Sequence, residues 1–192
     1  MIPNNAFTPV PIIAAFLPPL TDDYDPLLMR ATGGIALGDG SQGREVQFWT
    51  CSYDDVNINV EAEFSGVAGF SLPVDGVLSC CLAFDSNMAV AICYTKDDGG
   101  YLYYFNSLSS MFETLYFPAI TSCRVGVDKT TPFFNAQSDV IFGYVDTTAA
   151  LHWRQQRDRY ATEYDVGPVT KPLVRLGPSE DNRLQFQLLN FP

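Results

Sequence analysis

A weak internal repeat is the feature that most constrains how this chain of 192 residues folds. Two segments that begin with Ser-Cys and end with Asp are each followed by an apolar triplet and then by a strand-like segment that contains Leu. The equivalent segments are Ser79–Asp85 and Ser122–Asp128, Ile92–Tyr94 and Phe142–Tyr144, and those around Leu102 and Leu151. The repeat predicts two three-stranded antiparallel meanders, the second of which is lengthened by a polar insertion at 129–138.

A third, less similar copy is indicated at residues 44–64. Two strand-like runs, Val46–Cys51 and Val56–Phe64, flank a polar turn, so we expect a hairpin. In the second run apolar side chains alternate with Asn and Glu, as in a strand that is buried on one face. Residues 78–84 and 88–95 are instead almost continuously apolar, which is typical of strands covered on both faces.

The composition favours the same class. The chain has 16 Asp but only 6 Glu and 3 Lys, together with 14 Gly, 14 Phe and 10 Tyr. Asp and Gly belong to turns, whereas Glu and Lys fill exposed helix faces, so a mainly β protein is predicted. Two architectures remain open: an antiparallel β-sandwich and a propeller-like meander. Two clear copies fall short of the four or more blades that close a propeller.

The first 30 residues differ from the rest because six prolines stand within the first 26. Proline fixes φ and removes a donor, so this segment cannot form a helix or a central strand. It is nevertheless apolar, which predicts an extended arm at 1–30 in front of a single β domain at 31–192. The arm either wraps its own domain or contacts a neighbouring subunit. Its candidate interface residues are Phe7, Ile12, Ile13, Phe16 and Leu17.

No metal site or cofactor is predicted. The five cysteines include no Cys-x-x-Cys pair and His152 is the sole histidine, so buried free thiols and assembly in a reducing compartment are expected. The acidic segments 22–25 and 97–98 lack the spacing of a calcium loop. The glycines at 33–40 lack the Lys-Ser/Thr ending of a phosphate-binding loop.

No enzyme signature is present either. His152 has no Gly-x-Ser-x-Gly nucleophile motif to serve, so we expect a strand residue hydrogen-bonded to a neighbour. The pairs Asp54/Asp55 and Asp97/Asp98 are candidates for carboxylate catalysis, but both fall at turns, where Asp is favoured by local hydrogen bonds.

The densest charge cluster follows His152. Three arginines are interleaved with Asp158, Glu163 and Asp165, and aromatic residues lie in the same stretch. Guanidinium groups pair with carboxylates in partly buried networks, and Arg, Trp and Tyr are also enriched at subunit contacts. An intramolecular network and an interface are therefore both open. The candidate interface residues are Trp153, Arg154, Arg157, Arg159 and Tyr160.

Several stretches carry a resemblance to a family. They are Gly33–Gly43, Val46–Thr50, Leu82–Met88, Ser138–Tyr144, Arg154–Tyr160 and Arg183–Phe186. Over roughly residues 33–188 the chain resembles small virion proteins of tailed bacteriophages, and it departs from them at the 129–138 insertion. The resemblance implies a structural protein of the virion, in the tail or the neck. It also implies a homo-oligomer that contacts other virion proteins and assembles in the cytoplasm of the bacterial host.

Two alternatives stay open beside this interpretation. One is a receptor- or carbohydrate-binding β module, for which Tyr101, Tyr103 and Tyr104 would supply stacking surfaces. The other is a capsid-associated decoration protein. A glycan-degrading enzyme ranks below them.

The charge of the chain is unevenly distributed. The net charge of −11 argues against specific or tight binding to nucleic acid, and no apolar run approaches the roughly 20 residues of a membrane span. Residues 1–150 hold 5 basic and 17 acidic groups, whereas residues 151–192 hold 6 and 5. If the acidic part borders a channel through which DNA leaves, it would repel phosphate and keep any contact with DNA transient.

Overall fold

The computed structural model describes residues 32–37, 46–62, 69–85, 89–128, 139–178 and 183–189. The predicted arm at 1–30, with its five candidate interface residues, and the 129–138 insertion lie outside the described residues. The described part is mainly β with antiparallel sheets, as the sequence predicted. Among these residues no helix has the length and apolar character that crossing a bilayer requires.

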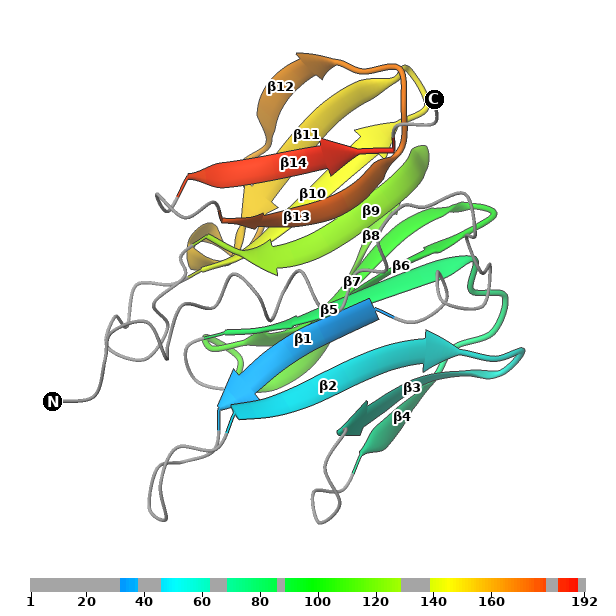
Figure 1. The fold of residues 1–192 in the computed structure, drawn as a ribbon, viewed down its shortest axis with the longest axis vertical. Coiled ribbons are helices and arrows are strands. Elements are labelled where there is room, and N and C mark those ends of the chain that lie inside the picture. The colour runs from blue at the N-terminus through cyan, green and yellow to red at the C-terminus, as the bar shows by residue number, and fades with distance from the viewer. Residues whose placement is uncertain are drawn as a thin grey trace, which may run out of the picture.

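The strands form consecutive antiparallel meanders in which spatial order equals chain order (Figure 1). The first sheet holds β1 Thr32–Leu37, β2 Val46–Tyr53, β3 Asn57–Ala62 and β4 Phe70–Pro73. The second holds β5 Ser79–Phe84, β6 Val90–Lys96, β7 Gly99–Asn106 and β8 Met111–Pro118. The third holds β9 Ile120–Val127, β10 Val140–Asp146, β11 Ala150–Gln155 and β12 Tyr164–Pro168, with the 3₁₀ turn η3 Gln156–Asp158 after β11. The hairpin of β13 Leu173–Pro178 and β14 Leu184–Leu188 follows.

The internal repeat corresponds to the second and third sheets. Its predicted strands are β5 and β9, β6 and β10, and β7 and β11. The prediction of three strands in each copy was wrong, because each sheet has a fourth, β8 or β12. The first sheet likewise has four strands and contains the predicted β2–β3 hairpin. A chain that repeats a four-stranded unit in this way matches the propeller-like alternative better than a sandwich of two sheets.

The first strand of each meander lies at the centre of the stack. Strand β5 packs against β1 on one side and against β9 on the other, and β9 packs in turn against β13 (Figure 1). Neighbouring sheets thus touch through their first strands, as the blades of a propeller do. Strands β4, β8 and β12 are each at the opposite edge of their sheet from its first strand.

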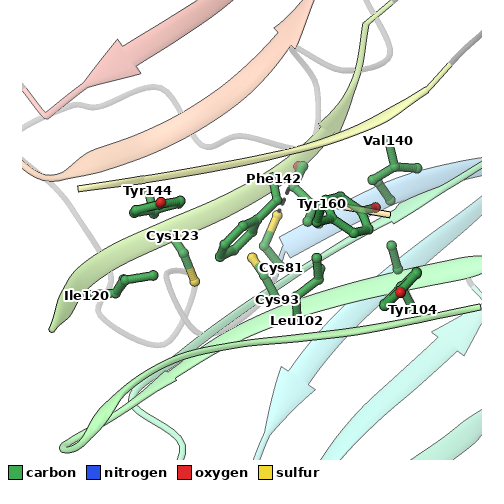
Figure 2. Packing of buried hydrophobic residues seen from close by; sticks show 13 residues of the cluster. Cys81, Cys93, Leu102, Tyr104, Ile120, Cys123, Val140, Phe142, Tyr144 and Tyr160 are labelled. Atoms are coloured by element: carbon green, nitrogen blue, oxygen red, sulfur yellow. Dashed lines mark hydrogen bonds between the residues drawn. The ribbon is translucent and has the colours of Figure 1, made fainter. Parts of the chain in front are cut away.

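One cluster of buried side chains fills the space between the second and third sheets (Figure 2). Cys81, Cys93 and Leu102 from the second sheet meet Cys123 and Phe142 from the third. Leu102 and Phe142 are fully buried, and burying a Leu or Phe side chain contributes about 1.5–3 kcal/mol, so this cluster stabilises the contact between the two sheets.

A second cluster lies between the first and second sheets. Ile58 and Val60 of β3 meet Leu82 of β5 and Ile92 of β6. Residues of β5 therefore alternate between the two clusters, which confirms that this apolar strand is covered on both faces.

All five cysteines are free and buried, as predicted. Burial raises the pKa of the Cys93 thiol well above its ordinary value, and a hydrogen bond with Cys80 raises that of Cys51. Because the thiolate is the reactive form, these two thiols behave as packing groups.

A glycine allows β13 to approach β9 closely. A Cβ atom at Gly126 would lie 2.3 Å from the carbonyl oxygen of Leu176. This close contact brings the backbone of β13 within reach of the Arg124 side chain, two residues earlier on β9.

Candidate functional sites: the Arg154 network and a polar cleft

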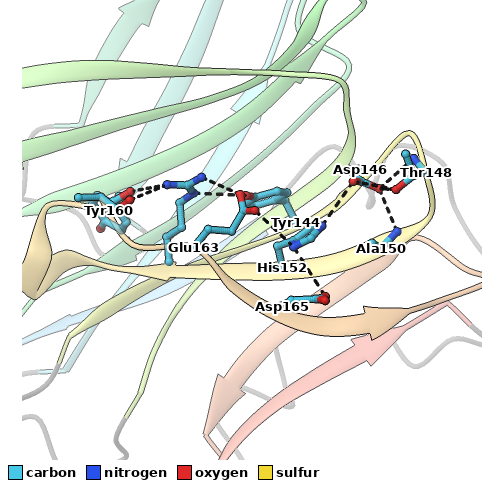
Figure 3. Close-up of polar contacts among 10 residues, drawn as sticks. Tyr144, Asp146, Thr148, Ala150, His152, Tyr160, Glu163 and Asp165 are labelled. Atoms are coloured by element: carbon cyan, nitrogen blue, oxygen red, sulfur yellow. Dashed lines mark hydrogen bonds and ion pairs between the residues drawn. The ribbon is translucent and has the colours of Figure 1, made fainter.

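The Arg154 side chain is the centre of a polar network on the third sheet, and Figure 3 labels its partners Tyr144, Tyr160 and Glu163. Its Nη2 lies 2.6 Å from Oε2 of Glu163, and its Nη1 donates to the carbonyl oxygens of Tyr160 at 2.9 Å and Ala161 at 3.1 Å. The hydroxyl of Tyr144 donates to Glu163 and lies 3.3 Å from Arg154 Nε. Arg154 thus fastens the segment that leads into β12 onto strands β10 and β11.

The ionisation of the network favours a paired carboxylate and a neutral phenol. Hydrogen bonds from Tyr144 and then Arg154 lower the pKa of Glu163. Burial, followed by the hydrogen bond to Glu163, raises the pKa of Tyr144 to about 12. At neutral pH the site therefore holds one cation and one anion, which is the arrangement of a structural ion pair.

His152 lies beside this network among three carboxylates. Its Nε2 is 3.4 Å from Asp146, and its Nδ1 is 3.8 Å from both Glu163 and Asp165. Asp146 in turn accepts the backbone N–H of Ala150, the largest cause of the lowered pKa of this carboxyl group. These polar contacts of His152 are all with acids, so they supply no nucleophile for it to activate.

Arg157 serves a different part of the fold. It pairs with Asp139 and lies 3.3 Å from Asp128, the residues on either side of the 129–138 insertion. The backbone N–H of Asp139 also donates to the Asp128 carboxylate at 2.9 Å. The Asp139 contact is the main cause that raises the pKa of Arg157. Arg157 thereby holds the two ends of the insertion together.

The remaining residues of this stretch divide between core and surface. Trp153 stacks on Tyr164 at 4.2 Å between ring centroids. Tyr160 is only 2% exposed and packs edge-on against Tyr104 at 5.0 Å, so it offers little surface to a second chain. Arg159 is exposed at a left-handed backbone position, with φ of 58°. The intramolecular network is present for Arg154 and Arg157, and the interface stays a prediction.

One acid of each turn pair, Asp54 and Asp98, accepts hydrogen bonds from nearby residues. Asp54 accepts the N–H groups of Val56 and Asn57, both at 2.8 Å, and these bonds lower the pKa of its carboxyl group. Asp98 accepts the hydroxyl of Tyr101 at 2.7 Å, which raises the pKa of this tyrosine to about 12. No group of three or more His, Cys, Asp or Glu side chains in the described ranges is arranged so that it could hold a metal ion.

A cleft of about 600 Å³ was not predicted from the sequence. It lies where one end of the second sheet, the start of β9 and the β13–β14 hairpin meet, and it is lined by the turn at 96–99, Thr147 and Leu189 among others. The buried polar or charged residues of the described part are Thr95, Ser122 and Arg124, and all three line this cleft.

Each of these three residues has an internal partner. The hydroxyl groups of Thr95 and Ser79 lie 2.7 Å apart, and Ser122 accepts the N–H of Leu173 at 3.0 Å. Arg124 donates from Nε to the carbonyl oxygen of Val174 at 3.0 Å and from Nη1 to that of Cys123 at 2.7 Å. The sequence signal for this site is a single charge within the apolar strand β9.

No family model matches the chain, and no curated protein or solved structure matches it either.

Proposed function

We propose that the chain is a structural component of a tailed-bacteriophage virion, in the tail or the neck, and that it acts by assembling with further copies and with other virion proteins. The resemblance of its sequence segments to virion proteins supports the proposal. The single structural observation that carries it is the exposed apolar outer strand of the second sheet, β8.

Strand β8 is an edge strand of eight residues, and no described strand pairs with its outer side. Its exposed side chains include Met111 (65% exposed), Phe112 (44%) and Tyr116 (50%), and Leu108 in the preceding turn is 75% exposed. Proteins that remain monomeric usually protect such an edge with charge, proline or short length. Here Glu113 is the only charged residue of the strand, and its one proline, Pro118, is the last residue.

The one charged side chain of β8, Glu113, is not free to oppose pairing along the edge. The carboxylate of Glu113 accepts the hydroxyl of Ser109 at 2.6 Å and the amide of Asn106 at 2.9 Å, which lowers its pKa. It is thus engaged with its own turn. An apolar edge that pairs with no described strand on its outer side, and whose one acid is locally bound, suits pairing with another chain.

The second candidate, a receptor- or carbohydrate-binding module, is favoured by the aromatic face beside β8. Tyr94, Tyr101 and Tyr116 form a row with successive ring centroids 5.0 Å apart, and Phe112 stacks on Tyr103 at 4.9 Å. Of these rings Phe112 and Tyr116 are exposed and can stack on sugars, whereas Tyr94 is only 5% exposed. Tyr104, which the sequence offered for this role, is 2% exposed and belongs to the core.

Quantitative mass spectrometry of purified particles tests the proposed function. Particles of the phage that encodes the chain should contain it in a fixed copy number relative to the other structural proteins. Its absence from purified particles contradicts the proposal. Saturable glycan binding by the free chain, lost in a Phe112→Ala/Tyr116→Ala variant, would favour the second candidate.

A further inference from the structure

Arg124, the buried arginine of the cleft, differs from Arg154 in its partners, because Arg154 is paired with Glu163. Arg124 is 9% exposed and pairs with no carboxylate among the described residues. Its two hydrogen bonds go to neutral carbonyl groups, and its Nη2 makes no hydrogen bond to the described residues. Removing a charge from water without a counter-charge is costly, so a buried guanidinium of this kind is best stabilised by an anion.

The cleft has room and further donors for such an anion. Its volume of about 600 Å³ far exceeds that of one carboxylate or phosphate group. Ser122 also lines it, and because its Oγ accepts the N–H of Leu173, its own hydroxyl hydrogen is available to donate. A planar guanidinium beside a hydroxyl is a common arrangement for binding oxyanions.

The other charged residues that line the cleft restrict which anions can bind there. Lys96 lines the cleft but is paired with the exposed Asp75 at 2.9 Å. Asp97 and Asp98 line it too, and both are exposed in the turn between β6 and β7. Two exposed acids in the lining repel a polyanion such as a nucleic-acid backbone. A ligand with one anionic group that reaches past them is favoured.

We propose that this cleft is a binding site for a single oxyanion group, a carboxylate or a phosphate, that docks on the free face of the Arg124 guanidinium. Ser122 donates the second hydrogen bond. Arg124 keeps its bonds to Cys123 and Val174, which hold the guanidinium in place before the ligand arrives. The site is separate from strand β8 and does not depend on the proposed virion function.

The test follows the arginine Nε–Hε signals of the ¹⁵N-labelled full chain by NMR. Inorganic phosphate and acetate are the two probes, titrated at an ionic strength kept constant with chloride. The Arg124 signal should shift saturably with at least one probe, while that of Arg154, which is closed by Glu163, stays in place. The probe that binds more tightly identifies the oxyanion. An Arg124 signal that moves with neither probe, or equally with chloride alone, overturns the proposal.

A pair of variants supplies the second readout. Bound anion should raise the melting temperature of the wild-type chain, since a ligand that binds only the folded state stabilises it. Arg124→Met should abolish this rise. Arg159→Met is the matched control, because it removes the same charge from an exposed position beyond the far end of β11, and it should keep the rise. A rise that persists in Arg124→Met overturns the proposal, and if that variant does not fold, the NMR titration of the wild-type chain decides.

Discussion

The outer strands of the second and third sheets occupy equivalent places in the repeat, yet their surfaces are opposite in character. Strand β12 is five residues long, contains Asp165 and Gly167, and follows a segment tied down by the Arg154–Glu163 ion pair. Strand β8 is eight residues long and presents exposed Met111, Phe112 and Tyr116. One edge is protected, and the other is open to a partner.

The difference shows how one meander unit can take two roles. Both strands end in proline, so the difference lies in length and charge: a short edge with nearby charges resists pairing with another chain, whereas a long apolar edge favours it. In the third sheet the polar side chains form hydrogen bonds with loops of the same chain. In the second sheet an apolar surface is left for contact, which is why assembly through β8 is the core of the proposed function.

Loss of the Arg154 network should produce the largest change in stability. Arg154→Met leaves Glu163, Tyr144 and two carbonyl groups without their shared donor, so the free energy of unfolding should fall by about 2 kcal/mol. Urea denaturation measures this, and Arg159→Met should change it by less than about 0.5 kcal/mol. Equal effects in the two variants would mean that the network does not stabilise the third sheet.

A charge placed on the open edge should weaken assembly. Thr114 is exposed on β8, and Thr114→Lys should raise the dissociation constant of the self-associated chain at least about tenfold, because a buried lysine at a paired edge must be desolvated. Sedimentation velocity over a range of concentrations measures the constant.

The matched control lies on the protected edge. Val166 is 51% exposed on β12, and Val166→Lys should leave self-association unchanged. If Val166→Lys weakens association as much as Thr114→Lys does, the contrast between the two edges is wrong.

Alkaline pH should loosen the third sheet through Tyr144. Its pKa is raised to about 12, above its ordinary value of 10, so its contribution to stability is present below pH 10 and is lost as the pH rises toward 12. Ultraviolet difference titration of the wild-type chain against Tyr144→Phe should show one phenol that ionises near pH 12. If Tyr144 instead ionised near pH 10, its hydroxyl group would not be hydrogen-bonded in the network.

Acid should act on the same network through Glu163, with a smaller effect because this side chain is 44% exposed. Its folded-state pKa is lowered, so its contribution is present above the unfolded value near 4.5 and is lost as the pH falls through the lowered one. The melting temperature of Glu163→Gln should therefore depend less on pH below 4.5 than that of the wild-type chain. Identical acid profiles would contradict this role.

The sequence predicts the strands whose patterns are strong and misses the outer ones. The continuous apolar runs in β5 and β6 and the alternation in β3 mark strands, because burial on two faces or on one leaves a direct trace in the pattern. In β12 the glycine, proline and acid hide the strand, and in β8 aromatic residues occur on both faces, so neither outer strand has a clear period.

The candidate site was predicted only in part. The arginine–carboxylate network was anticipated around Arg154, but the partners of Arg157 proved to be Asp128 and Asp139, which fold back from across the insertion. The cleft at Arg124 depends on three sheets meeting at one end, a long-range arrangement that local pattern does not encode. A lone charge inside an apolar strand is the one local sign of it.

Cryo-microscopy of purified particles tests directly whether the chain assembles through strand β8. Repeated copies of the chain are expected, each with β8 covered by a neighbouring chain and β12 left at the surface. Particles that lack the chain, or copies in which β8 faces solvent throughout, would contradict it.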